Sequence, residues 1–359
     1  MKSLTAFVLA SLLCGGAPDH LQRDADALVS LGVVGVQAQI MDGGGTRLVT
    51  AGVSDRLTRR PMPRQGRFRI ASTRKAMVAV VALQLVEEKR LRLDDPVALW
   101  WPGADERITV RHLLQNTSGL HDDQPGYTTP EEYSQQRYDV HTRAELIARS
   151  LRHPLDFAPG SGWGYSNTGF LLMDVVVERV GGAPSRRLVE DRIARPLGLR
   201  SLGWPGTSPA LPDPHSRAYQ QFPGGTLTDV TEQVPGDPDA IIASTRDLNV
   251  FFRALLGGRL LAPAQLAEMQ RTVRVGPEVE TFYPGAEYGL GLISRPLPCG
   301  GRYWGHDGGD AGFITVTGVT ASGRRSVVIT MNTALGGSAD SPLRQQRLAD
   351  ELVNHALCE

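Results

Sequence analysis

Residues 76–86 hold almost no polar side chain, and this apolar run constrains the fold more than any other feature of the chain. An apolar surface nearly all round is typical of a helix that is buried inside a protein. Ser72 and Lys75 stand just before the run and are three residues apart, so their side chains share one face of the predicted helix. The helix would therefore carry the Lys75 amine out of water.

Lysine is rare in this chain: of 38 basic residues only three, Lys2, Lys75 and Lys89, are lysines. A guanidinium stays protonated at any working pH, whereas a desolvated lysine amine can lose its proton and then accept one from a serine. The pair predicts a serine nucleophile, Ser72, with Lys75 as its proton partner. The alternative is a helix N-cap followed by a solvated lysine, and the apolar run disfavours it.

The composition is that of an ordinary globular protein, with 41% hydrophobic and 21% charged residues. Acidic and basic residues balance at 38 each, and no basic excess or charge run indicates a nucleic-acid or membrane-surface partner. The length allows one large domain or two closely packed ones, and we expect a monomer.

The first 16 residues have the pattern of an export signal. Lys2 gives a charged start, 4–13 is an apolar run, and Gly15 and Gly16 are small residues near a cleavage point. A run of about ten residues is too short for a membrane-spanning helix. We expect a secreted protein with no membrane span; the alternative is a short N-terminal core helix.

Removal of such a signal would take Cys14 with it and leave Cys299 and Cys358. Two cysteines in an exported protein suggest a disulfide. It would close a loop of about 60 residues and stabilise the fold by roughly 4 kcal/mol in the chain-entropy model. Two buried free thiols are the alternative.

Strand-like patterns lie near both ends of the chain, and the middle reads as helices joined by Pro-rich and Gly-rich connections. Predicted helices are 21–31, 72–86, 110–115, 143–151, 170–180, 185–193, 244–256, one opening at Pro263, and 341–357; predicted strands are 33–41, 48–53, 288–297, 313–319 and 326–332. We therefore expect an α+β fold, an antiparallel β-sheet flanked by N- and C-terminal helices with an inserted all-helical subdomain. The sheet part would be 17–92 and 216–359 and the helical part 93–215, together one catalytic unit.

Two further segments carry side chains suited to acyl transfer. In the glycine-rich stretch 159–167, Tyr165 and Asn167 project from one side; a phenol can relay a proton and an amide can orient a carbonyl. His306 lies in Trp304-Gly305-His306-Asp307-Gly308-Gly309 between two apparent strands, where glycines permit close backbone approach. Taken singly, the first is better explained as an ordinary loop with a packed tyrosine, and a lone histidine is more often structural.

Taken together, Ser72-x-x-Lys75, Tyr165-Ser166-Asn167 and His306-Asp307-Gly308 resemble the three motifs of the penicillin-recognising serine hydrolases, in order and in spacing. That superfamily includes class C β-lactamases, serine D-alanyl-D-alanine carboxypeptidases and related esterases. The chain most resembles the secreted Streptomyces carboxypeptidase, and Cys299 and Cys358 are similar to its disulfide pair. The similarity extends over nearly everything after about residue 25.

The resemblance implies a role for each matched residue. Ser72 would attack the substrate carbonyl, and Lys75 and Tyr165 would share the general acid and base work. Asn167 would hold the substrate amide, while His306 and Gly308 would line the substrate site. The backbone amides of Ser72 and Gly309 would form the oxyanion hole. An acyl-enzyme would form and then hydrolyse, without metal or cofactor.

Three departures from the carboxypeptidase pattern bear on the substrate. Ile293 stands where an arginine grips the peptide carboxylate, and Arg295, two residues on, is the nearest candidate for that task. Asp239 replaces a usual glycine, and a carboxylate there would repel an anionic peptide terminus. The third motif continues as Gly309-Asp310, where family members usually carry threonine or serine.

The function predicted from the sequence is a D-alanyl-D-alanine carboxypeptidase that β-lactams acylate, acting on small peptide or acyl substrates of the peptidoglycan stem type. The alternatives are an esterase, amidase or β-lactamase of the same fold, or a binding or sensing relative that does not turn over substrate.

Overall fold

The computed structural model describes residues 20–359 and has the expected α+β fold, with an antiparallel sheet of nine strands at its centre. The strands run in the order β2-β1-β13-β12-β10-β9-β8-β7, and β11 pairs with β12 beside this path. These strands are β1 (Gly35–Asp42), β2 (Gly45–Gly52), β7 (Val273–Arg274), β8 (Glu287–Tyr288), β9 (Ile293–Pro296), β10 (Arg302–Gly305), β11 (Gly308–Asp310), β12 (Phe313–Thr320) and β13 (Ser326–Met331).

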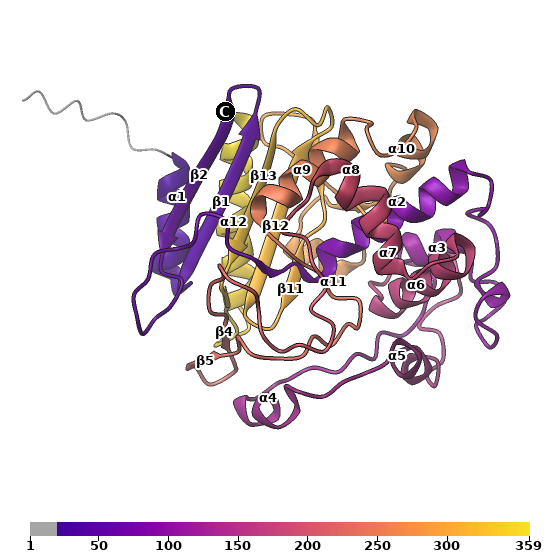
Figure 1. The fold of residues 1–359 in the computed structure, drawn as a ribbon, viewed down its shortest axis with the longest axis horizontal. Coiled ribbons are helices and arrows are strands. Elements are labelled where there is room, and N and C mark those ends of the chain that lie inside the picture. The colour runs from indigo at the N-terminus through magenta and orange to yellow at the C-terminus, as the bar shows by residue number, and fades with distance from the viewer. Residues whose placement is uncertain (1–19) are drawn as a thin grey trace, which may run out of the picture.

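Helices cover both faces of this sheet (Figure 1). The terminal helices α1 (His20–Leu31) and α12 (Ser341–Cys358) pack on one face and share a core with β1, β2, β12 and β13. Helix α9 (Thr245–Leu256) packs on the other face against β1 and β13. Strand β1 is therefore buried on both sides, with Ala38 facing the terminal helices and Gln39 bonded through its carbonyl to Asn249 of α9.

The remaining helices gather on the side of the sheet away from α1, as Figure 1 shows. Helix α2 (Arg74–Glu87) lies at their centre and packs on α6 (Asn167–Gly181) and on α7 (Ser185–Val189) and α10 (Pro263–Met269). The others are α3 (Val110–Leu114), α4 (Pro130–Gln136), α5 (Arg143–Ser150), α8 (Arg195–Leu197) and α11 (Pro277–Phe282). There are also 3₁₀ turns, η1 (Ala71–Thr73) and η2 (Val97–Leu99), and a π-helical segment, η3 (Glu190–Ala194). The expected burial of the apolar run is confirmed, because 76–83 and Leu85 are all buried.

Two small sheets lie outside the main one. Strand β3 (Phe68–Arg69) pairs with β6 (Ile242–Ala243), and β4 (Tyr219–Gln221) pairs with both β5 (Leu227–Asp229) and β14 (Thr333–Ala334). The first pair joins the chain just before Ser72 to the chain just before α9. The short strands β4 and β5 escaped sequence reasoning because three residues are too few for an alternating pattern to show.

The single strand predicted over 288–297 is wrong in one respect: it is broken into β8 and β9. The backbone turns at Gly289, whose amide bonds to the carbonyl of Leu292, and Gly291 has a φ of +71°. A Cβ on Gly291 would lie 2.7 Å from the Cβ of Ala79 and 3.2 Å from the carbonyl oxygen of Lys75. The strand is interrupted because its backbone packs directly on α2.

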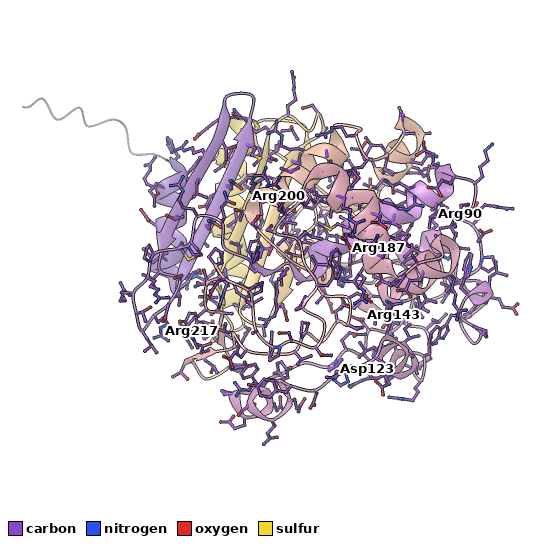
Figure 2. All side chains as sticks on the ribbon, viewed as in Figure 1. Arg90, Asp123, Arg143, Arg187, Arg200 and Arg217 are labelled. Carbon is purple, nitrogen blue, oxygen red and sulfur yellow. A yellow bond between two sulfur atoms is a disulfide. The ribbon has the colours of Figure 1, made fainter. Side chains whose placement is uncertain are left out.

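Charged side chains are spread widely over the molecule in the view of Figure 2. Figure 2 shows Arg90, Arg187, Arg200 and Arg217 on separate parts of the molecule. Arg187 pairs with Asp191 at 2.7 Å and Arg217 with Asp229 at 2.5 Å. No helix among residues 20–359 is long and apolar enough to cross a membrane. The predicted signal, 1–16, lies outside the described residues, and the boundaries of the two subdomains stay a prediction.

The predicted disulfide is present: Cys299 and Cys358 are bonded and tie the β9–β10 connection to the end of α12. We expect the double variant Cys299→Ser, Cys358→Ser to lose roughly 4 kcal/mol of unfolding free energy, because its unfolded chain regains the entropy of an open loop. Neither cysteine lines a cavity that holds Ser72, so kcat should stay within about twofold. Urea unfolding of both proteins measures the difference, and equal midpoints would contradict the prediction.

Candidate active site

Ser72 lies in η1, the tight turn between strand β3 and helix α2. The residue before it, Ala71, has a φ of +47°, a conformation that a residue with a Cβ adopts at a cost. The turn is held on both sides: the amide of Ile70 bonds to the carbonyl of Ile241, and the amide of Thr73 bonds to that of Ile70. The chain therefore presents Ser72 at a fixed, strained corner.

The Lys75 amine lies against the serine hydroxyl, as the spacing predicted. Its Nζ is 2.8 Å from Oγ of Ser72 and 2.6 Å from Oδ1 of Asn167, and the residue is only 5% exposed. Both hydrogen-bond partners are neutral groups, and water is largely excluded from the amine.

Tyr165 and Asn167 approach the amine from the start of α6. Ser166 caps this helix by accepting a hydrogen bond from the amide of Gly169, which leaves the residues on either side of it facing α2. The Tyr165 ring centre is 4.9 Å from Nζ of Lys75, and the Phe170 ring centre is 5.7 Å away. The structure therefore brings together the serine, the lysine, the phenol and the amide that were singled out in the sequence.

His306 is buried on the other side of Ser72, between β10 and β11. Its Nδ1 lies 2.8 Å from the carbonyl oxygen of Asp307, an atom that only accepts, so Nδ1 carries the proton and Nε2 accepts from the Tyr288 hydroxyl at 3.0 Å. Burial, with the nearby Lys75 charge second, lowers the pKa of His306 to about 3. The ring is therefore neutral at ordinary pH, 6.4 Å from the ring of Tyr165.

Strand β11 passes directly beside the turn that holds Ser72. A Cβ on Gly308 would lie 2.2 Å from the carbonyl oxygen of Ile70 and 2.9 Å from Oγ1 of Thr73, so only glycine fits there. Gly309 pairs with Ile314 of β12 and has room for a side chain. This approach is what an oxyanion hole built from the amides of Ser72 and Gly309 requires.

Two cavities meet at Ser72 and Gly309, which line both of them. The first, of about 300 Å³, has mostly apolar and aromatic walls and contains Tyr165 and His306; we call it the aromatic pocket. Its other side chains include Trp163, Val279, Phe282, Tyr283, Tyr288, Ile293 and Ile314. The second, of about 160 Å³, is lined by Asn167 and by charged side chains of both signs, Asp237 and Asp310 with Arg69, Arg74 and Lys75. We call it the acidic pocket because its carboxylates are more exposed than its guanidiniums.

This arrangement of serine, lysine and tyrosine can be compared with known proteins. A family model described as Beta-lactamase matches residues 21–351, nearly the whole chain. The chain belongs to the beta-lactamase family. Esterase EstB of Burkholderia gladioli is 30% identical over 340 residues, covering 80% of this chain and 82% of the esterase.

Two solved structures of beta-lactamase-like fold match over almost their full length. A D-stereospecific amidohydrolase from Streptomyces sp. is 37% identical with a TM-score of 0.84, over 95% of this chain and 99% of that one. D-amino acid amidase from Ochrobactrum anthropi SV3, solved with L-phenylalanine amide, is 25% identical with a TM-score of 0.81, over 94% and 98%. These relatives are an esterase and amidases, so the closer resemblance to the Streptomyces carboxypeptidase stays a prediction.

The expectation that Arg295 replaces the missing carboxylate-binding arginine of this family is not met. Arg295 is buried, and its guanidinium bonds to Asp307 and, at 2.8 Å, to Asp350 of α12. Tyr283 stacks on it, with 4.1 Å between the guanidinium carbon and the ring centre. Arg295 lines neither pocket, because Asp307 and Asp350 draw it into the interior, whereas Ile293 does line the aromatic pocket.

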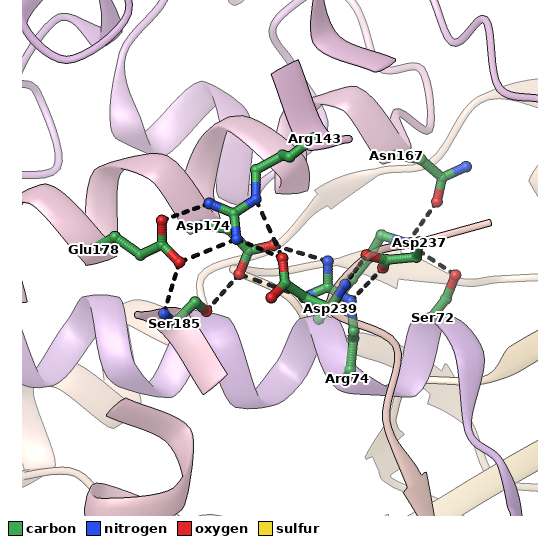
Figure 3. A network of polar contacts seen from close by, with 10 residues as sticks. Ser72, Arg74, Arg143, Asn167, Asp174, Glu178, Ser185, Asp237 and Asp239 are labelled. Atoms are coloured by element: carbon green, nitrogen blue, oxygen red, sulfur yellow. Dashed lines mark hydrogen bonds and ion pairs between the residues drawn. The ribbon is translucent and has the colours of Figure 1, made fainter. Parts of the chain in front are cut away.

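Asp239 also differs from its expected role, because its carboxylate is neutralised. It pairs with Arg143 of α5 at 2.5 Å, and Arg143 in turn pairs with Glu178 of α6 at 2.6 Å. The neighbouring Asp237 pairs with Arg74 at 2.5 Å, and Arg74 pairs with buried Asp174 at 2.8 Å. Figure 3 shows these groups as one ion-pair network beside Ser72. Asp237, rather than Asp239, lines the acidic pocket.

Sequence reasoning missed Asp122, Asp237 and Tyr288 as parts of the site. Asp122 accepts hydrogen bonds from the side chain and the backbone amide of Asn167, both at 2.8 Å. Nothing in the local sequence distinguishes it from the adjacent Asp123, which pairs with Arg149 at 2.7 Å. Tyr288 had a weak signal, since it ends the short strand beside the glycine-rich break.

The close passage of β11 over the Ser72 turn generates a paired prediction. Gly308→Ala would push β11 away from Ile70, and we expect kcat/KM to fall about a hundredfold, the loss typical of a displacement near 1 Å. Gly309→Ala is the matched control, because its nearest neighbour would be Ile314 at 3.5 Å; we expect a change of less than about threefold. Steady-state kinetics measure kcat/KM for both variants. Equal losses of kcat/KM would contradict the close contact between β11 and the Ser72 turn.

The neutral state of His306 generates a prediction about stability and pH. The unfolded chain binds a proton at histidine below about pH 6.5, whereas folded His306 does so only near its lowered pKa of about 3. This contribution is therefore complete above pH 6.5 and is lost as the pH falls from 6.5 toward 3. Between pH 7 and pH 4.5 the parent should lose roughly 2–3 kcal/mol more unfolding free energy than His306→Gln.

Urea unfolding of the two proteins at a series of pH values measures this difference. Parallel stability curves between pH 7 and pH 4.5 would mean that buried His306 is not held neutral.

Proposed function

We propose that this chain is a serine hydrolase that cleaves amides and esters of amino acids bearing a free α-amine, with a preference for the D configuration. The observation that carries the proposal is the pairing of Ser72 and Lys75 between an acidic and an aromatic pocket. The names of the D-stereospecific amidohydrolase and the D-amino acid amidase support the amide and the configuration.

In the proposed reaction the hydroxyl of Ser72 attacks the substrate carbonyl, and its proton passes to the pair formed by Lys75 and Tyr165. The carbonyl oxygen takes up negative charge facing the amides of Ser72 and Gly309. The pair then returns the proton to the leaving nitrogen or oxygen as its bond to carbon breaks, which leaves an acyl-serine. Water then attacks the ester carbonyl and gives a proton to the pair. The pair passes this proton to the Ser72 oxygen as the acyl bond breaks, which releases the acid and the free hydroxyl.

Each pocket has the chemistry for one half of such a substrate. The leaving group has to lie within reach of a proton donor, and Tyr165 is on the wall of the aromatic pocket, so the leaving group enters there. The acyl half then occupies the acidic pocket, beside Lys75 and Asn167. The Asn167 amide can donate a hydrogen bond to the acyl half.

In the acidic pocket the carboxylates are more exposed than the guanidiniums. The carboxylates of Asp237 and Asp310 are 37% and 29% exposed, whereas the neighbouring guanidiniums of Arg74 and Arg69 are 4% and 2% exposed. Arg74, Arg69 and Lys75 line the same pocket, but the carboxylates are the more exposed part of its charged wall. An α-ammonium group of the substrate would complement this wall.

The aromatic pocket disfavours the substrate of a carboxypeptidase. Among its lining residues the only charged group is Asp307, which Arg295 already neutralises, and the expected arginine is replaced by Ile293. A terminal carboxylate in the leaving group would find no cation there. An uncharged amine or alcohol suits these apolar walls better. D-alanyl-D-alanine carboxypeptidase activity is therefore the second candidate, supported by the three motifs.

A substrate panel tests the proposal. We expect D-phenylalanine amide or p-nitroanilide to be hydrolysed with a kcat/KM at least about a hundredfold above that of its N-acetyl derivative, because acetylation removes the ammonium charge. Asp237→Asn should raise KM for the free amine and leave the weak N-acetyl reaction unchanged. Ser72→Ala should abolish both, since no acyl-enzyme can form.

The other readings give different outcomes in the same panel. Release of D-alanine from an N-acylated D-alanyl-D-alanine peptide at a higher kcat/KM, with stable labelling of Ser72 by a β-lactam in mass spectrometry, would favour the carboxypeptidase. Absence of turnover and of labelling would favour a binding relative. Turnover that survives Ser72→Ala would contradict the proposed chemistry altogether. Export of the protein stays a proposal that rests on 1–16 and on the disulfide.

A further inference from the structure

Asp122 makes a set of contacts that the proposed reaction has not used. Its Oδ2 accepts from Nδ2 of Asn167 at 2.8 Å, and its Oδ1 accepts from the backbone amides of Asn167 at 2.8 Å and Thr168 at 3.3 Å. Asp122 touches neither Ser72 nor Lys75, and it lines neither pocket. It acts on the site only through Asn167.

The polarity of the Asn167 amide follows from this contact. An ionised carboxylate can only accept hydrogen bonds, so the nitrogen of the Asn167 amide has to face Asp122. The oxygen of the same amide is then turned to the opposite side, where it lies 2.6 Å from Nζ of Lys75. Figure 3 shows the Asn167 oxygen on the side of Ser72, on a dashed contact, and its nitrogen on the opposite side.

The opposite orientation of the amide would disturb the nucleophile. If Asn167 were flipped, its NH₂ group would face the amine, and two donors would meet at a distance that needs an acceptor. The Lys75 amine would then have to move, and its 2.8 Å contact with Ser72 would be lost. The fixed orientation also leaves the second hydrogen of Nδ2 free of Asp122 and available for the acyl half of the substrate.

The loop that carries Asp122 is held firmly enough to impose this orientation. The carbonyls of Asn116, Thr117 and Gly119 accept hydrogen bonds from the amides of Gly164, Gly160 and Asp156, at 2.8–3.0 Å. A Cβ on Gly119 would lie 2.0 Å from the carbonyl of Phe157, so the two segments are in direct backbone contact. The carboxylate is therefore positioned by the same glycine-rich stretch that leads to Tyr165.

We propose that Asp122 is a positioning residue for the reaction: it fixes the orientation of the Asn167 amide and thereby holds the Lys75 amine against Ser72. This inference rests on the proposed acyl-enzyme chemistry. A simpler role would be to satisfy the backbone amides at the start of α6. Asparagine and aspartate perform that capping role about equally well, so they separate the two roles.

The decisive variant is therefore Asp122→Asn, whose amide can still accept from the backbone of α6 but no longer dictates which way Asn167 points. We expect its thermal midpoint to stay close to that of the parent and its kcat to fall about ten- to a hundredfold, with a smaller change in KM. Asp122→Ala should lose at least as much kcat and some stability. Asp123→Asn, one residue on and paired with Arg149, is the matched control and should keep the parental kcat.

A double-mutant cycle provides the second readout. If Asp122 acts through Asn167, then Asp122→Asn should cost little further kcat in an Asn167→Ala background, so the two losses should not add. Parental kcat in Asp122→Asn, or additive losses in the cycle, would overturn the proposal. Failure of the underlying chemistry would appear differently, as turnover that persists in Ser72→Ala.

Discussion

The whole site depends on one amine that is held in the interior between a hydroxyl and a carboxamide. Lys75 is the second residue of a helix in which 76–83 and Leu85 are apolar and buried. Within residues 20–359 its amine pairs with no carboxylate, and it is reached by little water. The energetic cost of that burial is offset by the hydrogen bonds of the amine and by packing of α2 against α6. The first proton transfer of the proposed reaction takes place at this contact.

The backbone around the Lys75 amine is tightly packed and leaves it little freedom to move. Ser72 follows a residue with a strained backbone, β11 passes so close to the Ser72 turn that Gly308 cannot carry a side chain, and Gly291 packs against the back of α2. At the acidic pocket, Arg74 and Arg143 tie the segment of Asp237 and Asp239 to α5 and α6. Such buried pairs specify an arrangement more than they add stability, because desolvation costs much of what they gain.

The sequence predicted the parts of the molecule in which local pattern and local structure agree. The apolar run of α2, the hairpin of β12 and β13, the terminal helices and the disulfide all follow from spacing and residue type. The grouping of Ser72, Lys75, Tyr165 and Asn167 followed from the resemblance of three motifs. Their exact roles rest on the reaction proposed here rather than on their positions alone.

The remaining features depend on partners that are distant in the sequence. In a regular strand Arg295 would share a face with Ile293 and point toward the substrate. In the fold, its guanidinium instead bonds in the interior to Asp350, 55 residues later. From the sequence alone, Asp239 is expected to repel an anionic substrate. In the fold, Arg143, 96 residues earlier, pairs with it. The sequence gives no reason to distinguish Asp122 from Asp123. In the fold, Asp122 bonds to Asn167, whereas Asp123 pairs with Arg149.

The single-turnover acylation rate of Lys75→Arg tests the central claim most directly. With an activated ester substrate, rapid-quench mass spectrometry would follow the mass of the acyl group on the peptide that contains Ser72. A guanidinium cannot give up its proton, so we predict a rate at least about a thousandfold below that of the parent, in a variant that remains folded. Acylation of Ser72 at the parental rate in that variant would contradict the account.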